Sequence, residues 1–407
     1  MGKLARSPLA PEALPHLPPL AGVRMAAGQA GIRYANRTDL LLMTLCEGTT
    51  AAGVFTRSKA PSAPVDWCRS ILTTGTARAL VVNSGNANAF TGKKGVVAVN
   101  KSAMAAASAV NCLASDVYLA STGVIGEPLD YEKIERALPA LFAAQADDAW
   151  ADAAAAIMTT DTFPKAATQQ VVIAGKTVTI NGIAKGSGMI APDMATMLAF
   201  VFTDAKIAAP DLQKMLQQSN AKSFNAITVD GDTSTSDTAL MFATGKAGVS
   251  IEGEATPTFQ AALDALMIAL AKLVVMDGEG AQKLITIEVK GAESNEAAHR
   301  IGLAIGNSPL VKTAIAGEDA NWGRIVMAVG KSGERVERDV LSVAIGGVVI
   351  ARDGERVEGY DEAPVNAHMK TRDIHIAVDI GVGKGEATIW TCDLTHGYID
   401  INADYRS

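Results

Sequence analysis

The stretch Lys185-Gly-Ser-Gly-Met-Ile-Ala-Pro-Asp-Met-Ala-Thr-Met-Leu198 places one threonine at the junction between a loop and a strand. Two glycines and a proline interrupt regular structure in its first part. Residues 197–202, Met-Leu-Ala-Phe-Val-Phe, form a short apolar run that is typical of a buried strand. Thr196 therefore stands at the mouth of a buried strand, where we expect its hydroxyl to be held rigidly and still to meet solvent.

The same stretch contains a formal match to the relaxed dinucleotide-binding fingerprint, Gly186-Ser-Gly-Met-Ile-Ala191. In that fingerprint the last position opens a helix whose N-terminus meets the pyrophosphate. Here Pro192 and Asp193 lead into a β-type run instead. We therefore predict no dinucleotide site.

Composition limits the function classes. The chain has 407 residues, 48% of them hydrophobic, and a formal charge of -7, which suits a large core and two or three domains. Lys and Arg form no runs, so nothing favours nucleic acid or an acidic membrane as a partner. No apolar run approaches the roughly 18–20 residues of a membrane span, and the proline-rich start lacks a signal core. We expect a cytoplasmic protein with small-molecule partners.

Metal and redox sites are not expected. The four cysteines are too far apart for a zinc knuckle or a redox pair, which predicts free, mostly buried thiols. Residues 230–237, Asp-Gly-Asp-Thr-Ser-Thr-Ser-Asp, resemble a calcium loop, but Thr235 and Met241 stand where such a loop needs Gly and Glu. This segment is either a turn with self-capping side chains or the lining of a polar pocket.

The remaining pattern indicates an α/β protein. Strands are expected at 40–46, 79–83 and 117–119, the last two running into loops at 83–88 and 120–126, and a hairpin at 171–183. Helices are expected from the Ala-rich segment to about 110, over 130–158 with a kink or restart at Pro139, and from an N-cap at Thr256 with Pro257 in the first turn. Alternating strands follow at 285–289, 374–382 and 387–394, so we place a domain boundary near 281.

A catalytic threonine needs a base. The histidines lie far from Thr196 in sequence, and there is no Gly-x-Ser-x-Gly elbow, so a Ser/His/Asp triad is not expected. If the Ala195–Thr196 bond were cut, the α-amine of Thr196 could take the hydroxyl proton itself. The alternative is a threonine with a structural role at the start of a strand.

Nine ordered motifs resemble the ornithine acetyltransferases of arginine biosynthesis (glutamate N-acetyltransferase type), from the N-terminal strands to Ser407. They are Gly53-Val-Phe-Thr-Arg-Ser-Lys-Ala-Pro61, Val82-Asn-Ser-Gly-Asn-Ala-Asn88, Ser121-Thr-Gly-Val-Ile-Gly126, Met158-Thr-Thr-Asp-Thr162, Lys185-Gly-Ser-Gly-Met189, Met194-Ala-Thr-Met-Leu198, Thr228-Val-Asp-Gly-Asp-Thr233, Asp277-Gly-Glu-Gly280 and the terminal Asn402. The last residue is often Thr in that family, so Ser407 is a small departure that keeps the hydroxyl.

The resemblance implies a fold and a set of site residues. The fold would be a layered α-β-β-α sandwich similar to N-terminal-nucleophile hydrolases, with a core over 1–280 and a smaller C-terminal α/β domain over 281–407. Self-cleavage between Ala195 and Thr196 would give an α chain, 1–195, and a β chain, 196–407. Thr196 would be the nucleophile, and Thr122 and Gly123 the oxyanion hole. The implied substrate-binding residues are Thr162, Lys185, Thr196, Glu279, Asn402 and Ser407.

The resemblance also implies a reaction. Acetyl would pass from N2-acetyl-L-ornithine to Thr196 and then to L-glutamate, in a ping-pong sequence without a cofactor or metal. Acetyl-CoA is a possible co-substrate, and the fragments would assemble as α2β2. Two alternatives stay open: an amidase or aminopeptidase of the related self-processing fold, and a non-catalytic amino-acid-binding protein with an uncut chain.

Overall fold

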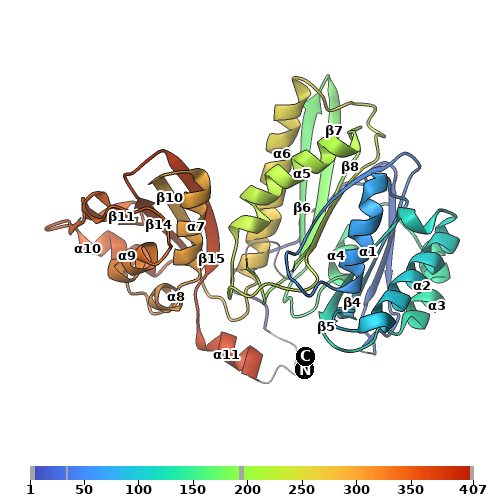
Figure 1. Ribbon diagram of the computed structural model, residues 1–407, viewed down its shortest axis with the longest axis horizontal. Helices are drawn as coiled ribbons and strands as arrows, with labels where there is room; N and C mark the ends of the chain where they lie inside the picture. Colours follow the sequence, from blue (N-terminus) through green and yellow to red (C-terminus); the bar gives the residue numbers. More distant parts are fainter. Residues whose placement is uncertain (1–4, 34, 192–196, 404–407) are drawn as a thin grey trace.

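The computed structural model describes residues 5–33, 35–191 and 197–403. Three β-sheets organise these residues. Two of them pack face to face, and the third lies to one side with its own helices, at left in orange and red in Figure 1.

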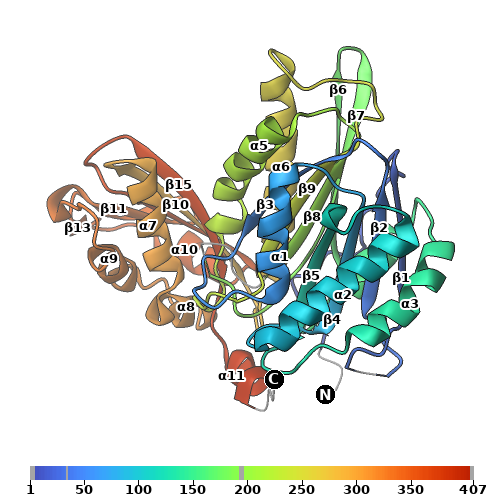
Figure 2. The ribbon, with the colours of Figure 1, turned by 45° about the vertical axis from the view of Figure 1, so that its right-hand side comes forward.

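The first sheet has the strand order β1 (Val23–Gly28), β2 (Leu40–Leu45), β4 (Ala79–Asn86) and β5 (Val117–Val124). Its neighbours are antiparallel except β4 and β5, which are parallel. Helices α2 (Gly92–Val110) and α3 (Tyr131–Ala143) lie side by side over its outer face (Figure 2), where small residues such as Ala103 and Ala106 allow close packing.

The second sheet has the order β3 (Thr50–Phe55), β9 (Thr238–Ala243), β8 (Leu198–Thr203), β7 (Lys176–Lys185) and β6 (Lys165–Ile173). Helices α5 (Ala209–Lys222) and α6 (Ala255–Met276) cover its outer face. The sequence analysis expected no apolar stretch of membrane-spanning length, but among the described residues α6 alone has the length and apolar composition that a membrane span would need. Its buried leucines pack into the core shared with the strands beneath it.

Aromatic side chains fill the space between the two sheets. Phe202 stacks on Phe242 with 5.3 Å between ring centroids, and Tyr118 and Trp150 meet these two rings edge-on at 5.5 Å. Helices α1 (Ala63–Ile71) and α4 (Trp150–Ala156) add residues to the same core. The order of layers is therefore α-β-β-α, as predicted.

The third sheet is built from later residues, in the order β13 (Glu355–Arg356), β12 (Val348–Arg352), β11 (Ser342–Ile345), β14 (Asp373–Asp379), β10 (Leu284–Ala292) and β15 (Gly385–Cys392). Its helices are α7 (Asn295–Gly306), α8 (Pro309–Ala316), α9 (Trp322–Gly330) and α10 (Glu362–Met369), followed by α11 (His396–Ala403). One apolar cluster runs from beneath α6 into this sheet without a break. The domain division near 281 therefore stays a prediction.

The predicted hairpin is present as β6 and β7, joined by Ala174 and Gly175, which both have positive φ angles. Several boundary predictions were wrong. Strands β4 and β5 continue through the expected loops as far as Asn86 and Val124, because they pair with each other in parallel along this length. Their polar side chains add contacts, as Ser121 Oγ donates to Asn83 Oδ1 at 2.6 Å.

Two helix predictions also need correction. Pro139 lies inside α3, and the chain restarts as a helix only at Trp150. Because Glu135 and Pro139 are both on the exposed side of α3, water can bond the backbone carbonyl that the proline leaves free. The N-cap of α6 is Glu254, not Thr256, so Pro257 still falls in the first turn, where its missing N–H costs nothing.

Candidate active site

The loop that carries the threonine leaves and re-enters the second sheet at one place. Strand β7 ends at Lys185, β8 begins at Leu198, and these two residues are paired. Met197, just before β8, donates its N–H to Asp237 Oδ1 at 3.0 Å and accepts from Thr238 N at 3.1 Å. Ala195 and Thr196 lie outside the described residues.

The predicted oxyanion pair lies at the end of β5, on the first sheet. Thr122 is buried. Gly123 has a φ of +129°, and a Cβ there would lie 2.3 Å from the carbonyl carbon of Gly85. Because β4 and β5 approach so closely, only glycine fits this position.

Lys185 joins the two sheets at this point. Its Nζ donates to Thr122 Oγ1 at 3.2 Å. Because the lysine ammonium donates to a lone pair of the hydroxyl oxygen, the hydroxyl proton points elsewhere and is free to donate. The structure thus brings together the predicted substrate-binding lysine and one predicted oxyanion donor.

Lys185 is buried but poorly paired. Within the described chain its ammonium makes that single hydrogen bond and no ion pair. Burial lowers the pKa of Lys185, and nearby Lys165 acts in the same direction, whereas Asp161, Asp237 and Glu279 oppose the shift. A cation held in this way can gain from an anionic ligand.

A fully paired charge network lies beside it. Lys165 Nζ is 2.6 Å from both Asp161 Oδ1 and Asp277 Oδ2, and all three side chains are shielded from solvent. Burial alone would raise the pKa of Asp161, but the Lys165 ammonium holds it below its usual value. Asp161 also accepts from Gly186 N at 2.7 Å, which ties the network to the start of the loop.

Thr162 belongs to this network. Its hydroxyl donates to Asp277 Oδ1 at 2.5 Å and accepts from Ser7 N at 2.9 Å, while its backbone N–H donates to Asp277 Oδ2. The hydroxyl proton and one of its two lone pairs are thus used within the protein, which leaves one lone pair for a further donor. The structure thus links Thr162 through Asp277 and Lys165 to Asp161, which binds the start of the loop.

Glu279 lies over the glycine-rich part of the loop. A Cβ on Gly188 would be 2.5 Å from the Glu279 carboxyl carbon. The Glu279 backbone N–H donates to Ser187 O at 3.0 Å, and Asn402 Nδ2, from α11, donates to Glu279 Oε2 at 2.8 Å. Burial raises the pKa of Glu279. Glu279 and Asn402, two of the residues predicted to bind substrate, therefore lie in contact, whereas Ser407 lies outside the described residues.

The segment 230–237 is the part of the site that the sequence left open. Asp230 accepts from Met189 N at 2.6 Å and from Ile190 N at 2.9 Å, and Asp237 accepts from Met197 N. Its carboxylates thus hold the backbone on both sides of residues 191–196. In the sequence, the hydroxyl- and carboxylate-rich composition of 230–237 was the available signal for a role in the site. That composition does not predict which backbone N–H groups its carboxylates bind.

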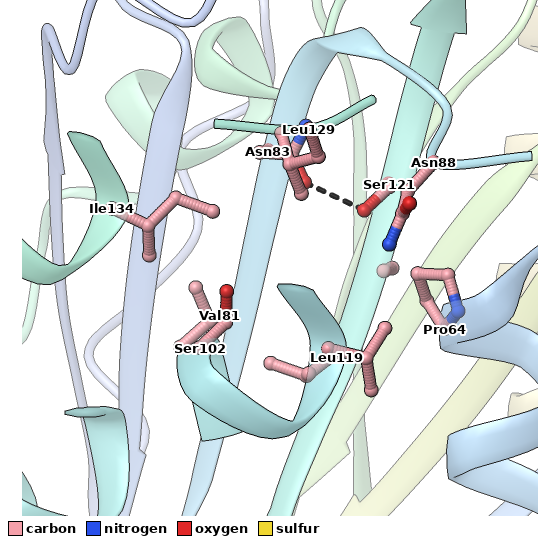
Figure 3. A pocket seen from close by; sticks show the side chains of 11 residues that line it. Pro64, Val81, Asn83, Asn88, Ser102, Leu119, Ser121, Leu129 and Ile134 are labelled. Atoms are coloured by element: carbon pink, nitrogen blue, oxygen red, sulfur yellow. Dashed lines mark hydrogen bonds between the residues drawn. The ribbon is translucent and has the colours of Figure 1, made fainter. Parts of the chain in front are cut away.

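A small cavity lies behind β5, between α2 and the outer face of the first sheet (Figure 3). Its volume is about 10 Å³, and Asn83, Ser102 and Ser121 contribute polar atoms to a lining that is otherwise mostly apolar. That is room for about one water molecule. It is too small for an amino-acid substrate.

The four-layer fold and the convergence of hydroxyl, glycine and lysine at one loop define a candidate acyl-transfer site. The chain belongs to the ArgJ family, whose sequence model matches residues 24–407.

Curated relatives support this assignment over nearly the full length. The arginine biosynthesis bifunctional protein ArgJ of Gluconobacter oxydans is 61% identical over 405 residues, which cover 98% of this chain and 95% of the relative. The protein of the same name from Mesorhizobium japonicum is 58% identical over 408 residues, covering 98% and 99%.

Solved structures give shorter matches. ArgJ of Bacillus halodurans is 41% identical, with a TM-score of 0.49, over 51% of this chain and 98% of that one. The ornithine acetyltransferase of Mycobacterium tuberculosis, solved with ornithine, is 36% identical, with a TM-score of 0.38, over 42% and 92%.

Proposed function

We propose that this chain is a glutamate N-acetyltransferase that moves the acetyl group of N2-acetyl-L-ornithine to L-glutamate in arginine biosynthesis. The observation that carries the proposal is the hydrogen bond from Lys185 Nζ to Thr122 Oγ1, beside the strand that follows Thr196. It sets a cation for an amino-acid carboxylate next to a hydroxyl free to stabilise an oxyanion. The names of the curated relatives agree with this pathway.

Self-processing supplies the nucleophile. Cleavage of the Ala195–Thr196 bond gives an α chain, 1–195, and a β chain, 196–407. The new α-amine of Thr196 has an ordinary pKa of about 7.7–8.0, so a useful fraction is neutral near pH 7 and can accept the hydroxyl proton.

The transfer then takes place in two halves. Thr196 Oγ attacks the acetyl carbonyl carbon, the Thr122 hydroxyl and the Gly123 N–H bind the oxyanion, and ornithine leaves with a proton on its amine. An acetyl-threonine ester remains. The amine of glutamate attacks this ester, and Thr196 Oγ regains its proton as N-acetylglutamate departs.

One pocket must accept a cationic and an anionic side chain in turn. Lys185 suits the α-carboxylate that both substrates share. An ionised Glu279 accepts from the side-chain ammonium of ornithine, and its raised pKa favours a protonated form that donates to the side-chain carboxylate of glutamate. Asn402 can donate and accept, so it serves either state. Thr162 and Ser407 complete the proposed contacts.

Several further properties belong to the proposal. Acetyl-CoA is a possible second acetyl donor, and the transfer uses no cofactor or metal. The fragments assemble as α2β2 in the cytoplasm.

Two measurements test the function. Intact mass and N-terminal sequencing are expected to show a fragment that begins Thr196-Met-Leu, and Thr196→Ala is expected to abolish both cleavage and transfer. With labelled N-acetylornithine and glutamate, the label is expected in N-acetylglutamate. Label released mainly as acetate would favour the amidase alternative, and full transfer by an uncut Thr196→Ala protein would overturn the proposal.

A further inference from the structure

Thr160 contacts the glycine-rich loop from the motif over residues 158–162. Thr162, two residues on, bonds Asp277. The half-buried Thr160 instead places its Oγ1 2.6 Å from Ser187 Oγ. The Thr160 hydroxyl also makes a hydrogen bond to the Glu279 carboxylate. Neither contact of Thr160 has a part in the proposed acetyl transfer.

Asp161 sets the hydroxyls of Thr160 and Ser187 opposite each other. Its Oδ2 accepts from Thr159 N at 2.9 Å, and its Oδ1 accepts from Gly186 N at 2.7 Å. These two N–H groups directly precede the two hydroxyl residues in the chain. One buried carboxylate therefore fixes the backbone beside both hydroxyls.

An ionised Glu279 fixes the direction of the hydrogen bonds in this chain. A carboxylate only accepts, so the Thr160 hydroxyl donates to it. Because its one proton is used in this way, Thr160 Oγ1 accepts from Ser187 Oγ. Ser187 is 1% exposed. Donation therefore runs from buried Ser187 through Thr160 to Glu279.

Glu279 is held from two sides. Asn402 Nδ2, on α11, donates to Oε2 at 2.8 Å, and the Thr160 hydroxyl donates from the segment between α4 and β6. The Glu279 backbone is tied to Ser187 O as well, at 3.0 Å. A carboxylate has about four lone-pair sites. Two side-chain donors therefore fix its orientation and still leave sites for the ammonium of a ligand.

The groups around Glu279 act on its charge in opposite directions. Burial raises its pKa, whereas the hydrogen bonds from Asn402 and Thr160 lower it. Asp230 adds to the rise and the Lys185 ammonium opposes it. The titratable groups that face the carboxyl are Lys185 on β7, Asp230 in the segment 230–237 and Tyr398 on α11. Thr160 is thus one of the groups that favour the ionised form.

We propose that Thr160, supported by Ser187, is the positioning residue that holds Glu279 toward the side-chain ammonium of ornithine and thereby sets the balance between the two substrates. The inference rests on the proposed function, in which Glu279 faces the side chains of ornithine and glutamate in turn. Thr160 acts through Glu279.

Loss of the Thr160 donor is expected to affect the two substrates in opposite directions. The ionised Glu279 carboxyl loses a hydrogen bond, so its pKa rises and more of it keeps a proton. A neutral carboxyl is a poorer acceptor for the ornithine ammonium, and it repels the glutamate carboxylate less. KM for N-acetylornithine should therefore rise, and KM for glutamate should fall.

The first test compares Thr160→Val with Thr160→Ser in initial-rate assays. At a pH where wild-type Glu279 is ionised, Thr160→Val is expected to raise KM for N-acetylornithine about 3- to 10-fold, as loss of one hydrogen bond predicts. KM for glutamate is expected to fall, and its rise with pH to begin at a higher pH. Thr160→Ser keeps the hydroxyl and is expected to restore both KM values and the pH profile.

The second test is a titration that needs no assay of transfer. Protein carrying 13C at the glutamate side-chain carboxyl is titrated by NMR, and the Glu279 signal is assigned by its absence in Glu279→Gln. The pKa of Glu279 is expected to be higher in Thr160→Val than in the wild type or in Thr160→Ser.

Thr44→Val is the matched control. Thr44 is also half-buried, and its hydroxyl donates to a side-chain oxygen, Gln145 Oε1, at 2.9 Å. It pairs with Ala79 at the start of β4, whereas the oxyanion pair lies at the end of the neighbouring β5. This variant is expected to keep the wild-type KM values and the wild-type titration of Glu279.

The outcomes separate this inference from the proposed function. An unchanged or lower pKa of Glu279 in Thr160→Val overturns the role of Thr160 and leaves the function intact. So do KM values that rise together or do not change, and so do equal changes in Thr44→Val. A wild type that moves no acetyl group from N-acetylornithine to glutamate overturns the proposed function, and the balance between substrates with it.

A second variant decides the matter if Thr160→Val does not fold, as judged by circular dichroism. Ser187→Ala removes the donor to Thr160 and weakens the chain of hydrogen bonds that ends at Glu279. It is expected to change the pKa of Glu279 and both KM values in the same directions by smaller amounts. Wild-type values in Ser187→Ala would then overturn the role of Thr160.

Discussion

Two buried lysines stand at the open end of the β6–β7 hairpin, and their surroundings differ. Lys165 begins β6 and bonds two carboxylates at 2.6 Å, whereas Lys185 ends β7 and bonds only the Thr122 hydroxyl within the described chain. Attraction to the carboxylates raises the pKa of Lys165 against the effect of burial, and burial lowers the pKa of Lys185. Lys165 thus has its charge balanced inside the fold, whereas Lys185 has no ion pair among the described residues, as a lysine that binds an anionic ligand would.

The largest effect is expected from Lys165→Met. The substitution leaves Asp161 and Asp277 buried without their cation, and breaking such a pair costs about 3–5 kcal/mol. Chemical denaturation is expected to show this loss, with partial recovery at lower pH, where the carboxylates take up protons. A Lys165→Met protein with wild-type stability would contradict the conclusion that the ion pairs of Lys165 stabilise the fold.

Thr122→Val comes next. It removes the hydroxyl that Lys185 orients, and loss of one oxyanion donor lowers kcat by about 100- to 1,000-fold. Stopped assays of acetyl transfer measure the effect. Thr122→Ser keeps the hydroxyl and is expected to retain most activity; equal losses in both variants would point to packing instead.

Lys185→Met is expected to lower kcat/KM for both substrates by about 10- to 150-fold, the value of hydrogen bonds to a charged group. Its effect on stability should have the opposite sign to that of Lys165→Met. Because the folded pKa of Lys185 lies below the unfolded value, the wild type gains stability as pH rises between the two, and the variant should lose that slope. Denaturation at several alkaline pH values checks this, and an unchanged slope would contradict it.

The smallest effect is expected from Glu279→Gln, at about tenfold or less in KM. In the wild type, KM for glutamate should rise as pH increases through the raised pKa of Glu279, because an ionised carboxylate repels the glutamate side chain. Glutamine cannot ionise, so this dependence should disappear while KM for N-acetylornithine rises. Initial rates with each substrate varied in turn measure both, and an unaltered pH dependence would assign it to another group.

Apolar runs and turn residues predicted the hairpin well, because they record burial and chain reversal locally, whereas the α-β-β-α layers were predicted only through the family resemblance. The family resemblance predicted Lys185 and Glu279 in one site, and in the structure Glu279 lies over Gly188, three residues after Lys185. The errors of the sequence-based predictions lie where partners are distant. Strand β4 runs on through polar residues because β5 supplies bonds to them, which no local pattern contains.

The carboxylates of the site show the same limit. Asp161, Asp230 and Asp237 each accept backbone N–H groups of the loop from far along the chain. The same Asp-rich composition is equally typical of turns in which the side chains cap their own backbone. Which of them holds a loop, and with which oxygen, is fixed only by how the sheets assemble.

The strand order of the second sheet has a consequence for the mature protein. Strands β8 and β9 come from residues after the proposed cut, yet they lie between β3 and β7, which come before it. After the proposed cut, strands of the two fragments would still alternate in one sheet. Unfolding would therefore release two separate chains, and the sheet could form again only if they associate. Refolding would then be second order and depend on concentration, unlike folding of the uncut precursor. If the chain is cut at the proposed site, folding of the precursor would come first and cleavage second, and the durability of the cut enzyme would be set by how slowly it opens.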